Sequence, residues 1–140
     1  MTVSFVVFGT PAPQGSKTLT RYGMREANKG TRPWREAVAW HAAEAMVGRE
    51  LLTGPLALEA TFWFPRPKSH YGTGRNLGVV KATAQLYVAT TPDLDKLLRA
   101  ISDAMSGIVY RDDAQIARSL ARKRYGKPLG AHIWVSEIAP

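Results

Sequence analysis

The sequence predicts an α+β fold: a single domain spanning residues 1–140, with two main helices packed on one mixed β-sheet and an antiparallel hairpin at the C-terminus. Three observations support this prediction. Strand-like and helix-like segments are interspersed along the chain, a pattern typical of helices layered on a mixed sheet. The length is close to the common size of one domain, and the 45% hydrophobic content is enough for one core.

Several segments have the pattern of β-strands. Residues 3–8 form a β-branched and aromatic run that glycine and proline then end. Residues 56–64 alternate between large apolar side chains and a mixed second set, which is the period of a strand with one buried face. Near the C-terminus, strands are predicted at residues 108–110, 116–124 and 131–138. The last two are predicted to form the antiparallel hairpin.

Two segments have helical periodicity. Pro33 fits the first turn of a helix, and apolar residues then recur at three- and four-residue spacing as far as Gly48. Pro92 precedes a second apolar stripe of the same period, which stops at Gly107. The sequence therefore predicts two amphipathic helices.

Two further segments show no sustained period and are predicted to be mobile surface loops. The first covers residues 12–31, and its part from Lys17 to Thr31 is expected to form a basic arm. The second covers residues 65–90, which is unusually long for a loop inside one domain. Loops of this length are often functional.

The composition excludes several kinds of site. The chain has no cysteine, so disulfides, thiolate zinc sites and cysteine nucleophiles are excluded, and any metal must be bound by oxygen or imidazole. No apolar run is long enough to cross a bilayer, and the first nine residues lack the features of a secretion signal. We therefore expect a soluble protein of the cytoplasm.

The charge balance favours a polyanionic partner. The chain has 19 Lys and Arg against 11 Asp and Glu, which gives a net charge of +8, and its pI is about 10.1. Such an excess attracts nucleic acid along its length, although many basic proteins bind none. The candidate nucleic-acid-binding residues are Lys17, Arg21, Arg25, Lys29, Arg66, Lys68, Arg75, Lys96, Arg118, Arg122 and Arg124.

A group of aspartates stands out against this basic background. Asp93 and Asp95 flank one leucine at the predicted start of the second helix, where aspartates commonly only cap the free backbone N–H groups. Asp113 follows the next predicted strand, and a helix followed by a returning strand can bring a third carboxylate to the same sheet end. Three hard oxygen ligands with water suit Mg²⁺, which in turn suits phosphodiester hydrolysis by one or two metals.

Arg99 is predicted to lie beside these carboxylates. At about 100° per residue, Asp95, Arg99 and Asp103 share one narrow helix face opposite the apolar stripe. An ordinary ion pair to a neighbouring aspartate would contribute only about 0.3–0.5 kcal/mol. If a phosphate is bound nearby, the guanidinium can bind it with two parallel hydrogen bonds, which is a stronger interaction than the ion pair.

Three motifs resemble the signature of the RusA family of Holliday junction resolvases. They are Pro92-Asp93-Leu94-Asp95-Lys96-Leu97-Leu98-Arg99, Asp103-Ala104-Met105 and Asp112-Asp113-Ala114-Gln115. The resemblance is most specific from Thr91 to Arg124. Residues 11–17, 32–36 and 66–68 resemble phage-type members more loosely.

This resemblance implies a function and a set of site residues. It implies that Asp93, Asp95 and Asp113 bind the metal, that Asp103 is a further family carboxylate, and that Mg²⁺ is the cofactor, with Mn²⁺ able to take its place. It also implies a homodimer that cuts branched DNA, a four-way junction, symmetrically in DNA recombination and repair, in the host cytoplasm if a phage encodes it. A dimer matches the two-fold symmetry of such a substrate.

One position departs from the family pattern. Where the family usually has a lysine, this chain has Arg99, and arginine does not release a proton near neutral pH. We expect Arg99 to act in catalysis through electrostatic stabilisation of phosphate, without proton transfer. Lys96 is a secondary candidate for the role of the lysine, although a solvated lysine on a polar helix face is the simpler interpretation.

Two functions are therefore weighed. The first is an endodeoxyribonuclease whose catalytic residues are Asp93, Asp95, Asp113 and Arg99. The second is a non-catalytic DNA- or RNA-binding module, in which the aspartates only cap and form ion pairs. The two differ in whether the protein nicks any branched or linear substrate in the presence of magnesium.

Overall fold

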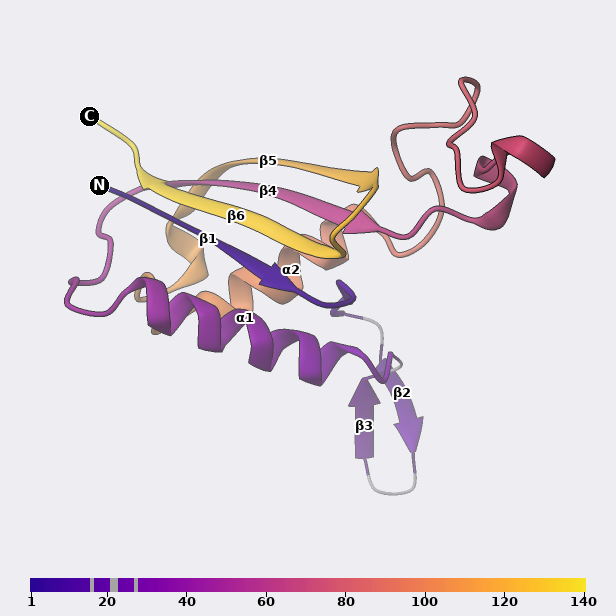
Figure 1. Ribbon diagram of the computed structural model, residues 1–140. Helices are drawn as coiled ribbons and strands as arrows, with labels where there is room; N and C mark the ends of the chain where they lie inside the picture. The colour runs from indigo at the N-terminus through magenta and orange to yellow at the C-terminus, as the bar shows by residue number, and fades with distance from the viewer. Residues whose placement is uncertain (16, 21–22, 27) are drawn as a thin grey trace.

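The computed structural model describes residues 1–15, 17–20, 23–26 and 28–140, with the side chains of residues 16–27 left out (Figure 1). Its centre is a four-stranded sheet in the order β1 (Thr2–Phe8), β6 (Gly130–Glu137), β4 (Leu56–Phe64) and β5 (Ile116–Tyr125). β6 is antiparallel to both β1 and β4, whereas β5 is parallel to β4. The sheet is therefore mixed, as predicted.

Two α-helices of the described residues, α1 (Thr31–Ala45) and α2 (Leu94–Met105), lie on the same side of the sheet (Figure 1). They contact each other, and α1 also contacts β1. This layering confirms the predicted α+β class, with two main helices on one mixed sheet. Within the described ranges, neither α-helix combines the length and the hydropathy that a membrane-spanning helix requires.

The core fills the space between the helices and the sheet. β4 contributes alternate residues that are almost completely buried, which is why its sequence alternates. α2 buries a stripe at three- and four-residue spacing and leaves its other face exposed. The buried side chains of these two elements include Leu56, Leu58, Ala60, Phe62, Leu97, Ala100, Ile101, Ala104 and Met105.

The C-terminal strands need one correction. β5 and β6 follow each other and run in opposite directions, but they are not paired, because β4 lies between them. Parallel strands such as β4 and β5 need a long crossover connection, and α2 lies in that connection. A periodic pattern identifies a strand but not its neighbours, so the sequence did not indicate this insertion.

The short strand predicted at residues 108–110 is a turn. Gly107 has a positive φ of 83° directly after α2, and its N–H donates to the Tyr110 carbonyl over 2.7 Å. Val109 and Tyr110 are fully buried, so their apolar character comes from core packing after a helix C-terminus. A run of three residues was too short to separate the two explanations.

The two predicted loops contain local structure. Residues 12–31 include β2 (Lys17–Thr20) and β3 (Gly23–Glu26), which pair as a separate antiparallel sheet. Residues 65–90 include two short 3₁₀ helices, η1 (Lys68–His70) and η2 (Gly74–Asn76), and bridges between distant residues. Mobility of either segment stays a prediction.

One carboxylate predicts a pH dependence of stability. Glu137 accepts hydrogen bonds from the Thr53 N–H and hydroxyl at 2.9 and 3.1 Å and faces the N-terminal ammonium, and these contacts lower its pKa. The contribution of these contacts to stability is fully present above the ordinary glutamate pKa. It is lost as the pH falls through the lowered pKa of Glu137. We expect Glu137→Gln to destabilise the protein at neutral pH but not at low pH, where urea unfolding curves should coincide.

Candidate active site

The N-terminus of α2 presents two carboxylates to solvent. Asp93 is the residue before the first turn, with an extended backbone whose carbonyl accepts the Leu97 N–H at 3.1 Å. Its side chain makes no capping hydrogen bond, and Asp95 lies in the first turn, also exposed. Lys96 Nζ lies 3.7 Å from an Asp93 carboxyl oxygen. The Asp93 carboxylate is therefore not used to cap the helix.

Lys123 holds the chain that leads into α2. Its ammonium donates to the carbonyls of Thr90 and Pro92 over 2.7 and 2.8 Å, from near the end of β5. The contact fixes where α2 begins and therefore where Asp93 lies. The neighbouring Arg122 and Arg124 were predicted to bind nucleic acid, and the role of Lys123 in positioning α2 was not predicted.

Asp113 lies at the opposite end of α2. It opens the short 3₁₀ helix η3 (Asp113–Gln115), which Asp112 caps by accepting the Ala114 N–H over 2.8 Å. The pKa of Asp113 is raised by partial burial, by Asp112 and by the negative charge of Asp103. Asp103 is in the last turns of α2, so Asp113 shares that end of the helix.

Within one chain, the three predicted metal ligands do not form one group. A helix rises about 1.5 Å per residue, so Asp95 and Asp103 are about 12 Å apart along the axis of α2. β5 runs back along α2. Asp113, which lies shortly before β5 in the chain, is therefore near the C-terminus of α2, and Lys123, near the end of β5, is near the N-terminus of α2. Over the described part of the chain, no three His, Cys, Asp or Glu side chains are placed to hold a metal ion. The ligand set stays a prediction.

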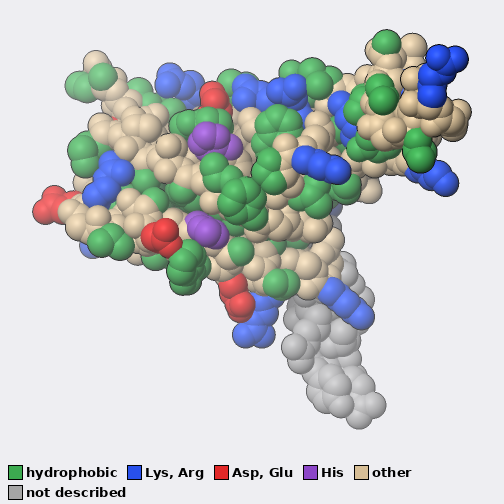
Figure 2. Space-filling model, in the orientation of Figure 1, with side chains coloured by type: hydrophobic (Ala, Val, Ile, Leu, Met, Phe, Trp, Pro, Cys, Tyr) green, Lys and Arg blue, Asp and Glu red, His purple; other side chains and the backbone are tan. Residues whose placement is uncertain are grey.

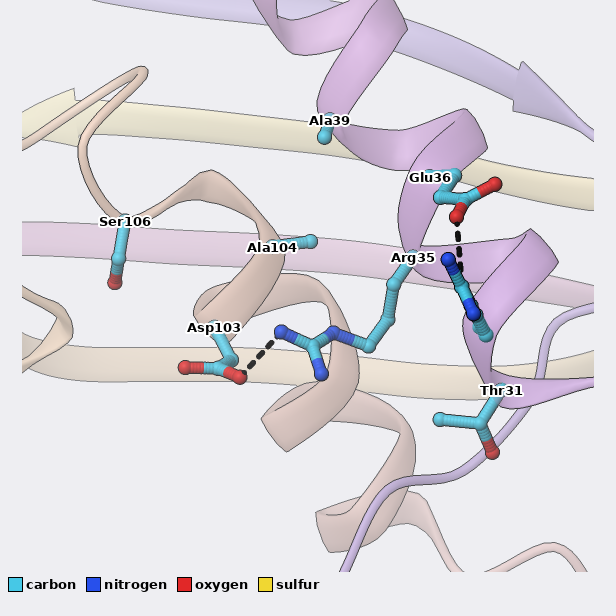
Figure 3. Close-up of a pocket in the computed structure, with 8 residues that line it drawn as sticks. Thr31, Arg35, Glu36, Ala39, Asp103, Ala104 and Ser106 are labelled. Atoms are coloured by element: carbon cyan, nitrogen blue, oxygen red, sulfur yellow. Dashed lines mark hydrogen bonds and ion pairs between the residues drawn. The ribbon is translucent and has the colours of Figure 1, made fainter. Parts of the chain in front are cut away.

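Asp103 joins three parts of the fold. Its Oδ2 accepts Gln14 Nε2 at 3.0 Å and lies 2.7 Å from Arg35 Nη2. Figure 3 shows Arg35 reaching from α1 to Asp103 on α2. Both side chains line an open groove of about 580 Å³. The Gln14 N–H donates to the Lys96 carbonyl over 3.0 Å, so residues 11–15 dock along α2.

Arg99 lies against this docked segment. A Cβ atom at residue 15 would come within 2.5 Å of Arg99 Nη1, so Gly15 leaves the space that the guanidinium occupies. Gly15 also has a backbone φ of 115°, which residues other than glycine rarely adopt. Arg99 is exposed, on the same helix as Asp95 and Asp103, as its spacing predicted.

Comparison with known proteins assigns the chain to a family. The family described as "Endodeoxyribonuclease RusA" matches residues 9–136, nearly the whole chain. The chain belongs to the RusA family. It is also 26% identical over 142 residues to the "Uncharacterized protein YqaN" of Bacillus subtilis (strain 168), with 98% of this chain and 97% of that protein covered. An endonuclease activity on DNA is what RusA membership implies.

Three of the RusA-like segments meet at Asp103. The segments at residues 11–17 and 32–36 resembled the family only loosely in sequence, yet Gln14 of the first and Arg35 of the second contact Asp103. Gln14 and Arg35 were not predicted as site residues. Their presence in family-like segments was the available signal, because side chains at such distant positions are not linked by any local period.

The predicted nucleic-acid-binding bases have different surroundings. Lys29, Lys68, Arg75 and Arg118 are exposed, and Figure 2 shows Lys and Arg side chains spread over one face of the molecule. The side chains of Lys17, Arg21 and Arg25 lie outside the described residues. The remaining four, Arg66, Lys96, Arg122 and Arg124, are half-buried.

Two of these half-buried bases contact side chains of β4. Arg122 Nη1 donates to the Thr61 hydroxyl over 3.0 Å and lies 4.0 Å from Glu59. The Arg124 guanidinium lies over the Trp63 ring, with 5.0 Å between Cζ and the ring centroid. These contacts stabilise the sheet, and binding of DNA by either residue stays a prediction.

The raised pKa of Asp113 predicts a stabilising substitution. A raised folded-state pKa means that stability is highest below the ordinary aspartate pKa and is lost as the pH rises through the raised one. Asp113→Asn removes the repelled charge, so we expect a higher unfolding midpoint at neutral pH in a chelator. Asp112→Ala is the control, since losing the Ala114 bond should cost about 1 kcal/mol. An unchanged or lower midpoint for Asp113→Asn would contradict the raised pKa of Asp113.

Proposed function

We propose that this RusA-family chain is a magnesium-dependent, structure-selective endodeoxyribonuclease that resolves four-way DNA junctions in recombination and repair, in the cytoplasm. The observation that carries the proposal is the arrangement of charged side chains at the start of α2. There, Asp93 and Asp95 point exposed carboxylates into solvent while Arg99 follows on the same helix. Carboxylates and a guanidinium grouped in this way suit a phosphodiester and its metal.

The donor chemistry fits Mg²⁺, but one chain does not assemble the three ligands. Carboxylate oxygens are the protein ligands that Mg²⁺ prefers, and Asp93 is free of a capping hydrogen bond. Asp113, however, lies at the other end of α2. A group of Asp93, Asp95 and Asp113 therefore requires a second copy of the chain or a rearrangement, and a homodimer is part of this proposal.

When bound, the cation would neutralise a phosphate and lower the pKa of an attacking water. The residues of the chain have separate tasks. Asp93 and Asp95 supply negative oxygen ligands, and Asp113 completes the set. Arg99 binds a phosphate oxygen through its guanidinium, which stays protonated and so stabilises charge without moving a proton. Lys96 is the secondary candidate, since its ammonium already lies 3.7 Å from Asp93.

The exposed bases would bind the arms of the junction. Four of them face solvent and are accessible to the regularly spaced phosphates of a duplex: Lys29, Lys68, Arg75 and Arg118. Such contacts position the enzyme on its substrate but carry no sequence information. Affinity for a junction should therefore fall steeply with salt.

A cleavage assay on a synthetic four-way junction tests the function. The protein is incubated with the junction, with a linear duplex of the same sequence and with a flapped duplex, in magnesium or in EDTA. We expect paired nicks in opposite strands of the junction in magnesium alone. Intact strands under every condition, with the junction still bound, would instead support the non-catalytic binding module.

A further inference from the structure

Residues 65–90, termed here the finger, project from the end of the sheet between β4 and α2 (Figure 1). The finger has four bases, Arg66, Lys68, Arg75 and Lys81, and no acid. Apart from its anchoring residues, most of its side chains are exposed. None of the proposed catalytic residues lies in it.

The base of the finger is fixed to β5. Arg66 Nη1 donates to the Gln85 carbonyl over 2.8 Å, which joins the two ends of the finger. Arg66 also lies over the Tyr125 ring, and the His70 ring meets that ring edge-on with centroids 4.8 Å apart. The Tyr125 N–H donates to the Leu86 carbonyl over 3.0 Å. The finger therefore has a defined direction relative to the sheet.

The tip of the finger has a compact backbone. The Gly72 N–H donates to the Val79 carbonyl over 2.9 Å, and the Lys81 N–H donates to the His70 carbonyl over 2.9 Å. Gly72 packs so closely on Asn76 that a Cβ would lie 2.7 Å from the Asn76 Cβ. A tip that is already folded loses less conformational entropy on binding than a flexible loop does.

The tip exposes apolar side chains among bases. Leu77 is 76% exposed, Val79 is 55% exposed and Val80 is 43% exposed. Single exposed apolar residues are common, but three together on a projection that is hydrogen-bonded at its base and tip mark an interaction surface. Arg75 and Lys81 flank them, so the occupant must combine apolar surfaces with negative charge.

We propose that the finger tip is a wedge that enters the branch point of the DNA substrate, with Leu77 and Val79 against exposed base faces and Arg75 and Lys81 on the adjoining phosphates. The inference rests on the proposed function, because it takes branched DNA as the substrate. Its support is charge complementarity: a finger with four bases and no acid suits a polyanion. Apolar wedges of this kind unstack base steps, and unstacking costs least where pairing is already interrupted.

The test follows base unstacking and binding in EDTA, where no cleavage occurs. A four-way junction carries 2-aminopurine beside the crossover, and a linear duplex carries it at the same sequence. We expect the protein to raise the emission of the junction but not of the duplex. Leu77→Ala and Val79→Ala should each remove most of this rise and weaken junction binding about fivefold or more, with duplex binding unchanged.

Val47→Ala is the matched control, since Val47 is 78% exposed, beyond the end of α1, and not on the finger. It should bind and unstack as the original chain does. A normal emission rise and affinity in both finger variants would overturn the wedge. So would a change of molecular mass in those variants by light scattering without loss of unstacking, which would make the tip a protein contact. Absent cleavage in magnesium with the unstacking intact would refute the nuclease and leave the wedge standing.

Discussion

Asp93→Asn is expected to lower magnesium-dependent cleavage of a four-way junction by about 10³-fold or more, because a neutral amide is a poor ligand for a hard cation. Metal stabilisation of a phosphoryl transition state amounts to several kcal/mol, and each 1.4 kcal/mol is about tenfold in rate. Binding of the junction should be kept or strengthened, since a negative charge next to the DNA is removed. Single-turnover cleavage and a gel-shift titration measure the two effects.

Asp112→Asn is the matched control for this substitution. It removes one carboxylate charge next to Asp113, at the other end of α2 from Asp93, and asparagine can still accept the Ala114 N–H that Asp112 accepts now. We expect its cleavage rate to stay within about tenfold of the original. Equal losses for the two variants would show that general acidity, and not a ligand at Asp93, controls the rate.

The second large effect concerns the helix that carries the site. Ile101 is fully buried in the stripe of α2 that packs on the core. Ile101→Ala should lower the free energy of unfolding by about 2–5 kcal/mol, because it removes buried methyl groups and leaves a cavity. Urea unfolding followed by circular dichroism gives this quantity.

The exposed face of β5 provides the control for stability. Leu120 is 55% exposed, so Leu120→Ala should change the free energy of unfolding by no more than about 0.5 kcal/mol. A loss below about 1 kcal/mol for Ile101→Ala would mean that α2 is loosely packed. In that case the helix could not hold Asp95 and Arg99 in a fixed arrangement.

The elements of the fold could be predicted because their patterns are local. The strand at residues 56–64 buries the alternate apolar residues that its sequence pattern indicates, with Thr61 buried as well, and the stripe of α2 follows the helical period. Pairing is not local. The insertion of β4 between β5 and β6 depends on the crossover through α2, which no pattern inside either strand encodes.

The positions of candidate residues along α2 could be predicted, but the arrangement of the three aspartates in space could not. The pair Asp93 and Asp95 was placed correctly at the start of α2, with Arg99 on the same helix. Asp113 was expected to return to them, whereas β5 starts at the other end of the helix, near Asp103. Gln14 and Arg35 precede Asp103 by almost ninety and almost seventy positions in the chain. The Arg35 contact arises when α1 packs beside α2, and the Gln14 contact arises when residues 11–15 dock along α2.

Anomalous diffraction from crystals loaded with Mn²⁺ tests most directly whether Asp93, Asp95 and Asp113 share a divalent cation. The proposal predicts a manganese peak within about 2.0–2.3 Å of carboxyl oxygens of Asp93 and Asp95, with the Asp113 carboxylate of either copy completing the set. A fully occupied manganese ion elsewhere, with these three carboxylates unliganded and still at opposite ends of α2 in every copy, would contradict it.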